Sequence, residues 1–145
     1  MNKRICYLAG PMRGIPAFNF PAFDSAASEL RQQGWEVISP ASLDREHGFR
    51  ADKYAPDYPF SASEIREFVR RDVDALLSLR HRAGDAIVLL PATAADKRGW
   101  AESVGARAEV GLAVWLGLDV YVYQWETRSL VPVNVTVTAS ATEKI

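Results

Sequence analysis

The chain has 145 residues, of which 48% are hydrophobic and 24% charged, a composition that favours one globular domain with a sizeable core. Its formal net charge of -1 argues against a nucleic-acid-binding surface, because phosphate backbones are held by a local excess of Lys and Arg. A single cysteine, Cys6, rules out a disulfide framework, and His47 and His81 lack the spacing of metal ligands. We therefore expect a small-molecule partner, no metal and a reducing, cytoplasmic location.

The first predicted elements are a strand and a helix. Residues 4–9 form a short apolar run that ends at Gly10, the pattern of a buried parallel strand and too short for a signal peptide. Asn19 is a plausible cap for a helix over residues 21–33, and Gly34 is its expected stop.

The middle of the chain predicts a short strand, a long loop and a second helix. Residues 35–39 predict the strand. Residues 41–60 contain two prolines, mixed charge and no regular period, so we expect a functional lid there, since structureless segments of this length are uncommon without a role. Ser61 and Glu64 form a capping-box signature for a helix that runs to about residue 82. Its inward stripe is predicted to be Ile65, Phe68, Val69, Val73, Leu76 and Leu77.

The second half of the chain predicts two more strands around a helix. The strands cover residues 85–90 and 119–123, and the helix lies within residues 99–117. Residues 131–137 predict either a last strand or a segment that reaches a neighbouring subunit, and residues 138–145 predict a loose tail.

This alternating order predicts an α/β fold: a Rossmann/flavodoxin-like three-layer sandwich with a parallel sheet of four to five strands, in a single domain over residues 1–137. Ligands in such sheets bind beyond the carboxyl ends of the strands. The loops over residues 10–20, 41–60 and 91–103 should therefore converge on one crevice. No membrane-spanning segment is expected, because Asp119 interrupts the C-terminal apolar stretch.

Glu109 is the only charge in residues 108–117, a run that reads as a buried helix. If that helix begins near Ser103, Glu109 shares its face with Gly105 and with apolar side chains of the next turns. An isolated carboxylate is costly to bury, so this position needs either a hydrogen-bond network or a chemical role. A structural glutamate with a partner, or one at a subunit contact, is as good an interpretation here as a catalytic acid.

Asp72 is the second acid with an unusual position. It projects into the apolar stripe of its helix, whereas Asp74 projects to the solvated side. The alternative is a structural ion pair with Arg70 or Arg71, which is weakened because those two side chains are expected to project away from Asp72. Two inward carboxylates on neighbouring helices indicate acid or nucleophile chemistry at a sugar carbon.

The loop after the first strand carries a candidate anion site. It reads Gly10-Pro11-Met12-Arg13-Gly14 and does not match the dinucleotide fingerprint G-x-G-x-x-G. Arg13 could fork onto a phosphate or carboxylate, and the two glycines would let the backbone approach a ligand closely. The alternative is a plain Gly-Pro turn with a solvated arginine.

Several of these pieces together resemble one superfamily. Residues 7–14 (YLAGPMRG), the Asn19-Phe20-Pro21 step, Asp72, the strand from Asp85 and residues 103–109 (SVGARAE) resemble the nucleoside 2-deoxyribosyltransferase superfamily in order and spacing. The most similar branches are the 2'-deoxynucleoside 5'-phosphate N-hydrolases and a small uncharacterised family common in phages. The resemblance covers about residues 4–123, without the lid.

The resemblance implies roles for the candidate residues. Glu109 would be the nucleophile at C1' of the sugar, Tyr7 would lie beside its carboxylate, and Asp72 would contact the sugar or base and help to protonate the leaving group. The substrate-binding residues would be Gly10, Arg13, Ser103 and Gly105, with Arg13 and Ser103 on the 5'-phosphate.

Two positions bear on the substrate that the resemblance implies. The N-hydrolases have a phosphate-binding serine where this chain has Pro11, which offers neither a hydroxyl nor an N–H. The nucleoside-specific transferases have an aspartate at the position that corresponds to Ser103, and its charge would repel a phosphate. Serine at this position therefore favours monophosphates as substrates. The family completes each site with a residue of a neighbouring subunit, for which Asn134 is a candidate, so a homodimer or higher homo-oligomer is expected.

The implied activity is hydrolysis of the N-glycosidic bond of a (deoxy)nucleoside 5'-monophosphate, without a cofactor. Base exchange by a deoxyribosyltransferase is the nearest alternative, and access of water to the intermediate would decide between the two. A non-catalytic nucleotide-binding protein and an NAD glycohydrolase are further alternatives. Two carboxylates would not help a protein that only binds an anionic nucleotide, and an NAD-sized ligand would fit less easily beside Pro11 and the lid.

Overall fold

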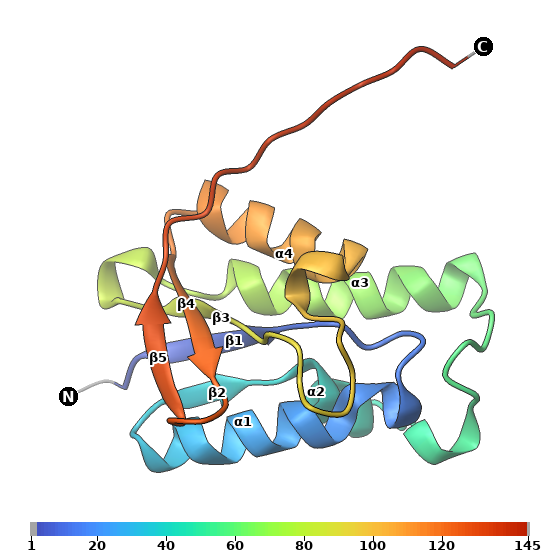
Figure 1. Cartoon of the computed structure of the whole chain (residues 1–145), viewed down its shortest axis with the longest axis horizontal. Helices are drawn as coiled ribbons and strands as arrows, with labels where there is room; N and C mark the ends of the chain where they lie inside the picture. Colours follow the sequence, from blue (N-terminus) through green and yellow to red (C-terminus); the bar gives the residue numbers. More distant parts are fainter. Residues whose placement is uncertain (1–2, 145) are drawn as a thin grey trace.

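The computed structural model describes residues 3–144. Its strands and helices alternate along most of the chain (Figure 1). In chain order they are β1 (Ile5–Ala9), α1 (Phe20–Gln32), β2 (Glu36–Ile38), α2 (Pro40–Glu46), α3 (Ala62–Leu77), β3 (Ala86–Leu89), α4 (Val104–Trp115), β4 (Asp119–Gln124) and β5 (Ser129–Pro132).

The strands form one sheet in the order β2-β1-β3-β4-β5. The first four are parallel, and β5 pairs antiparallel with β4. Helices α3 and α4 cover one face of the sheet and α1 covers the other (Figure 1). The predicted three-layer α/β sandwich is therefore confirmed. This strand order is that of flavodoxin-like folds, in which ligands bind where the connections from β1 and β3 diverge.

Each face of the sheet has its own core. On the α1 side, alternate strand residues such as Leu8 and Val88 pack against Phe23 of α1. On the other side, Tyr7 of β1 packs among residues of α3 and α4, including Val110. Full burial of side chains of this size stabilises the fold by roughly 1.5–3 kcal/mol each. The alternation of β1 thus places Tyr7 on the α3–α4 face.

The segment expected to be an irregular lid begins with a helix. Pro40 occupies the first turn of α2, a position that favours proline because the missing N–H has no partner there in any case. Its seven residues make about two turns, too few for a periodic pattern, so the sequence did not reveal this helix. The rest of the segment is held down by an aromatic cluster in which Phe49 stacks on Tyr54 at 5.1 Å between ring centroids and contacts Phe18 and Phe68.

Helix α3 ends five residues earlier than predicted. The reason is Asp85, a fully buried carboxylate that accepts hydrogen bonds from the backbone N–H of Arg80 at 2.8 Å, from its Nε at 3.0 Å and from the N–H of Ile5 at 2.8 Å. These bonds turn the chain from α3 into β3. The predicted inward stripe is also too wide, since Val69 and Leu77 are 52% and 55% exposed.

The last strand starts earlier than predicted, at Ser129 instead of residue 131, and ends at Pro132. A tight turn with Arg128 in the left-handed region (φ 54°) folds β5 back onto β4. Such a turn has no periodic pattern of apolar residues, so the sequence did not predict where β5 begins. Residues 136–144 are exposed and have no regular structure. Within residues 3–144, no helix combines the length and apolarity that crossing a membrane requires.

Candidate active site

Tyr7 and Glu109 meet between β1 and α4. The Tyr7 side chain is fully buried, and its hydroxyl donates a hydrogen bond to Oε2 of Glu109. The predicted inward position of Glu109 is therefore what the structure shows, and its carboxylate has a partner on a different element. A carboxylate that accepts a phenolic O–H in a buried place is held in one orientation.

Asp72 reaches the same place from α3. Its Oδ1 is buried and has no hydrogen-bond partner among the described residues, whereas Asp74 is exposed as expected. Buried side-chain oxygens are rarely left without a partner unless a ligand or water supplies one. The geometry thus leaves Asp72 with an oxygen available for a ligand.

Burial dominates the electrostatics of this group. It raises the pKa of Asp72 to about 7, helped by the charge of Asp44 and opposed by Arg71 and Tyr7. It raises the pKa of Glu109 to about 8, helped by the charge of Asp72 and opposed by the Tyr7 hydroxyl. It also holds the pKa of Tyr7 well above its ordinary value, with Glu109 the next cause. Burial, and for Glu109 also the charge of Asp72, thus shifts both carboxyl groups toward their protonated forms near neutral pH.

Arg71 was expected to project away from Asp72, and it forms no ion pair with Asp72 among the described residues. Its side chain reaches α2, where Nη2 donates to Oδ1 of Asp44 at 3.1 Å. This ion pair is largely buried, with 18% of the Arg71 side chain and 11% of the Asp44 side chain exposed. Asp44 could not be singled out from the sequence, because α2 was not predicted as a helix.

Three loops meet at Gly14, as the strand order led us to expect. Its N–H donates to the carbonyl of Pro56 at 2.9 Å, and its carbonyl accepts from Nη2 of Arg98 at 2.9 Å. Gly14 has a φ of +78°, which favours glycine. The loops after β1, α2 and β3 therefore converge at one place. Arg98, which links two of them, was not singled out from the sequence.

Arg13 lies at this junction with its side chain exposed. Its guanidinium carbon is 5.6 Å from the centre of the Phe60 ring, and no carboxylate within residues 3–144 forms an ion pair with it. Gly10 is buried, and a Cβ there would come within 3.0 Å of Cβ of Leu90. Close packing between β1 and β3 thus accounts for Gly10, and Arg13 is the group in this loop that is free to hold an anion.

Ser103 and Gly105 form the first turn of α4. The Ser103 Oγ accepts a hydrogen bond from the N–H of Ala106 at 3.1 Å, so it caps the helix and still has its own proton to donate. Nothing lies within 4 Å of the position that a Cβ of Gly105 would take. An open helix N-terminus with a hydroxyl is a suitable place for a phosphate.

An unusual turn links the first loop to α1. Ala17, Phe18 and Asn19 are consecutive residues in the left-handed region, with φ of 54°, 53° and 60°. Asn19 is the N-cap residue of α1, as predicted, but its side chain makes no capping bond. Its Nδ2 donates to the carbonyl of Pro11 at 2.9 Å instead. Left-handed turns of non-glycine residues are rare and cluster at functional sites.

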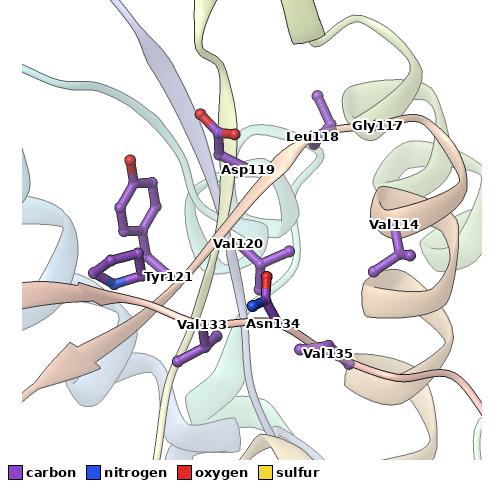
Figure 2. A pocket seen from close by; sticks show the side chains of 10 residues that line it. Val114, Gly117, Leu118, Asp119, Val120, Tyr121, Val133, Asn134 and Val135 are labelled. Atoms are coloured by element: carbon purple, nitrogen blue, oxygen red, sulfur yellow. The ribbon is translucent and has the colours of Figure 1, made fainter.

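Two cavities lie away from Tyr7, Asp72 and Glu109. One, of about 600 Å³, lies between the start of α1 and residues 49–56. The other, of about 410 Å³, lies at the amino end of β4 beside the end of α4, and Figure 2 shows the segment with Asn134 running from beside β4 toward that helix. Asn134 therefore lies at the opposite end of the sheet from the loops that meet at Gly14, and it does not belong to the site of its own subunit.

Comparison with known proteins finds a similarity over the first half of the chain only. A family model described as "Domain of unknown function (DUF4406)" matches residues 4–67. The match includes Tyr7 and Arg13 and stops before Asp72 and Glu109. No curated protein matches the chain significantly.

Proposed function

We propose that this chain hydrolyses the N-glycosidic bond of a (deoxy)nucleoside 5'-monophosphate and releases the free base and the sugar phosphate. The observation that carries the proposal is the buried group of Tyr7, Glu109 and Asp72, which combines an oriented carboxylate with a second carboxyl that has an unpartnered oxygen. The order of these residues along a flavodoxin-like sheet supports a relationship to the nucleoside 2-deoxyribosyltransferase superfamily.

The reaction proceeds in two steps. An oxygen of ionised Glu109 attacks C1' while the bond from C1' to the base breaks, its electron pair goes to the base, and protonated Asp72 gives its proton to the departing base. Water then attacks C1', the ester to Glu109 breaks, and the Asp72 carboxylate takes the proton of the water. The configuration at C1' is retained. Tyr7 orients Glu109 and lowers the free energy of its ionised form.

The phosphate is held at the junction of the loops. Arg13 supplies a charge without a competing carboxylate, and the first turn of α4 supplies the Ser103 hydroxyl and free backbone N–H groups. Arg98 joins the β3–α4 loop to Gly14, next to Arg13, and so brings these two parts together.

The decisive experiment is an assay of free base by chromatography with a panel of nucleosides, 5'-monophosphates and NAD. Wild type should release base, and Glu109→Gln should lose this activity by orders of magnitude, because the amide keeps the shape but not the charge needed at C1'. Glu126→Gln, a change at an exposed glutamate, is the matched control and should behave as wild type.

The outcomes separate the proposed activity from its alternatives. Near-wild-type release by Glu109→Gln would remove Glu109 as the nucleophile. Transfer of the sugar to a second base added in excess would identify a deoxyribosyltransferase, and release of nicotinamide alone would identify an NAD glycohydrolase. Binding of nucleotides without any release of base would leave only a binding protein.

The phosphate site is tested by comparing a deoxynucleoside with its monophosphate. A charge-assisted hydrogen bond contributes roughly 1.5 to 3 kcal/mol, so we expect about a tenfold to hundredfold preference for the monophosphate in kcat/KM. Arg13→Ala should remove most of this preference, whereas Arg66→Ala, at an exposed position of α3, should not. An unchanged preference in Arg13→Ala would show that the phosphate lies elsewhere.

A further inference from the structure

The Arg98 side chain joins the two loops that lead to the proposed phosphate site. Its Nη2 donates to the carbonyl of Gly14 at 2.9 Å, in the loop that carries Arg13. A Cβ at Gly14 would lie 2.9 Å from Nη1 of Arg98, so the absence of a side chain there gives the guanidinium its room. Because this bond ends on the residue next to Arg13, it helps to fix the point from which the Arg13 side chain extends.

Asp96 holds the Arg98 side chain in this position. Its Oδ1 accepts from Nε of Arg98 at 2.9 Å and from the Arg98 backbone N–H at 2.9 Å, and its Oδ2 accepts from Nη2 at 2.7 Å. The N–H of Asp96 donates in turn to Oγ1 of Thr93 at 3.2 Å. Two parallel bonds to one carboxylate fix the plane of a guanidinium. With one N–H of Nη2 on Asp96, the other is directed to Gly14.

The short segment from Arg98 to Ser103 is also held by hydrogen bonds. Gly99 is buried. The N–H of Trp100 donates to the carbonyl of Leu90 at 2.9 Å, just beyond β3, and the N–H of Ser103 donates to the carbonyl of Trp100 at 3.1 Å. A continuous set of bonds therefore runs from the loop after β1, through Arg98, to the first turn of α4.

This connection fixes the separation of the two parts of the phosphate site. Arg13 lies on the loop after β1 and Ser103 at the start of α4, and Arg98 links the two elements. A phosphate bound by both needs them at a set distance, and binding groups that are held in the right geometry contribute far more than mobile ones. A nucleoside has no phosphate and makes no use of this distance.

We propose that the Asp96–Arg98 pair is a positioning element that gives the protein its preference for 5'-monophosphates over nucleosides. Arg98 acts through Gly14 on Arg13, Asp96 acts through Arg98, and neither side chain touches the phosphate. This inference rests on the proposed function, because it assigns the phosphate to Arg13 and Ser103.

Asp96→Asn separates the effect of position from the effect of charge. It removes a negative charge near the phosphate, so electrostatics alone would strengthen the preference for the monophosphate. We expect the opposite, because the amide nitrogen cannot accept from Nη2 of Arg98 and the guanidinium is released. The ratio of kcat/KM for a deoxynucleoside monophosphate to that for its nucleoside should fall about threefold to tenfold, chiefly through KM of the monophosphate, as expected for a weakened charge-assisted hydrogen bond.

Two further variants support this comparison. Arg98→Lys keeps the charge but not the two parallel bonds, so its ratio should fall as in Asp96→Asn. Lys97→Ala removes a charge from the adjacent exposed residue and is the matched control, whose ratio should stay near that of wild type. If Asp96→Asn or Arg98→Lys does not fold, Thr93→Val removes only the support of Asp96 and should shift the ratio in the same direction.

Inorganic phosphate gives a second readout that needs no catalysis. Its binding to the substrate-free protein is followed by ¹⁵N NMR at the Gly14 amide and at Nε of Arg13. Wild type and Lys97→Ala should bind it equally, and Asp96→Asn and Arg98→Lys should bind it about threefold to tenfold more weakly, for the same reason.

The proposal is overturned if Asp96→Asn strengthens the preference for the monophosphate or leaves it unchanged. It is also overturned if activity on the nucleoside and on the monophosphate falls alike, since that is the mark of a purely structural role, or if phosphate binds equally to all variants or not at all to wild type. Wild type that binds phosphate but releases no base, with weaker phosphate binding in the two variants, would contradict only the proposed hydrolysis.

Discussion

At the scale of single residues, Glu109 is placed where its charge destabilises the fold. Its pKa rises from an ordinary value of 4.5 to about 8, chiefly through burial. Between these values the folded protein binds more protons than the unfolded chain, so the free energy of unfolding falls as the pH rises through this window. Residues kept for their chemistry often carry such a cost.

Glu109→Gln should therefore be more stable than wild type at alkaline pH. The amide can still accept the Tyr7 hydroxyl but has no charge to bury, so the difference in Tm between variant and wild type should be small below about pH 4.5, grow with pH and level off above about pH 8. Thermal unfolding followed by circular dichroism at several pH values measures this. A Tm difference that is independent of pH would mean that folding does not raise the pKa of Glu109.

The two central acids could be predicted from the sequence, but their surroundings could not. Helical periodicity alone showed that Asp72 and Glu109 face inward, because each lies among apolar residues at helical spacing. The ion pair between Arg71 and Asp44 joins residues far apart in sequence, and no local pattern encodes such a contact. The role of Tyr7 came from a resemblance and not from the apolar run in which it lies.

At the scale of elements, the left-handed turn before α1 is expected to cost stability. Each non-glycine residue in this conformation costs roughly 1–2 kcal/mol, an amount that glycine avoids. Ala17→Gly should therefore leave stability unchanged or raise it by up to about 1 kcal/mol, after the larger chain entropy of glycine is subtracted.

The matched control is Ala22→Gly, the same change in right-handed α1, which should lower stability by about 0.5–1 kcal/mol. Denaturant unfolding of the two variants gives both values. If Ala17→Gly destabilises the protein as much as Ala22→Gly, the turn is not strained.

Helices and strands could be predicted where the apolar pattern was long, but the residues at which they end could not. The buried strands β1 and β3 and the capped start of α3 were confirmed, because apolar runs and a capping box are local signals. The predicted end of α3 was wrong, because the buried Asp85 beyond the helix binds the N–H of Arg80 and turns the chain toward β3. Ala17, Phe18 and Asn19 adopt a left-handed conformation that non-glycine residues usually avoid, so no sequence pattern predicts this turn.

At the scale of the whole molecule, α4 exposes apolar side chains that the sheet does not cover. Val104 is 85% exposed and Trp115 87%, while Val110 of the same helix is buried against the sheet. Large exposed apolar side chains on one helix are typical of an interface, and a second copy of the chain is the partner that the superfamily resemblance implies.

We expect the protein to be at least a dimer in solution. Light scattering at micromolar concentration should give a mass of twice 16.1 kDa or more, and Trp115→Glu should shift the equilibrium toward the monomer because a charge would be buried in the contact. Glu126→Gln should leave the mass unchanged. A wild-type mass of 16.1 kDa would contradict the prediction.

The short edges of the sheet limit how copies of this chain can associate. At one edge β2 has three residues, and at the other β5 has four and ends in Pro132, which has no N–H to offer. Unpaired edge strands recruit further chains and lead to aggregates, and short strands and prolines are the usual protection against this. We therefore expect copies of this chain to associate through α4 as a closed pair and not as a fibre that grows strand by strand.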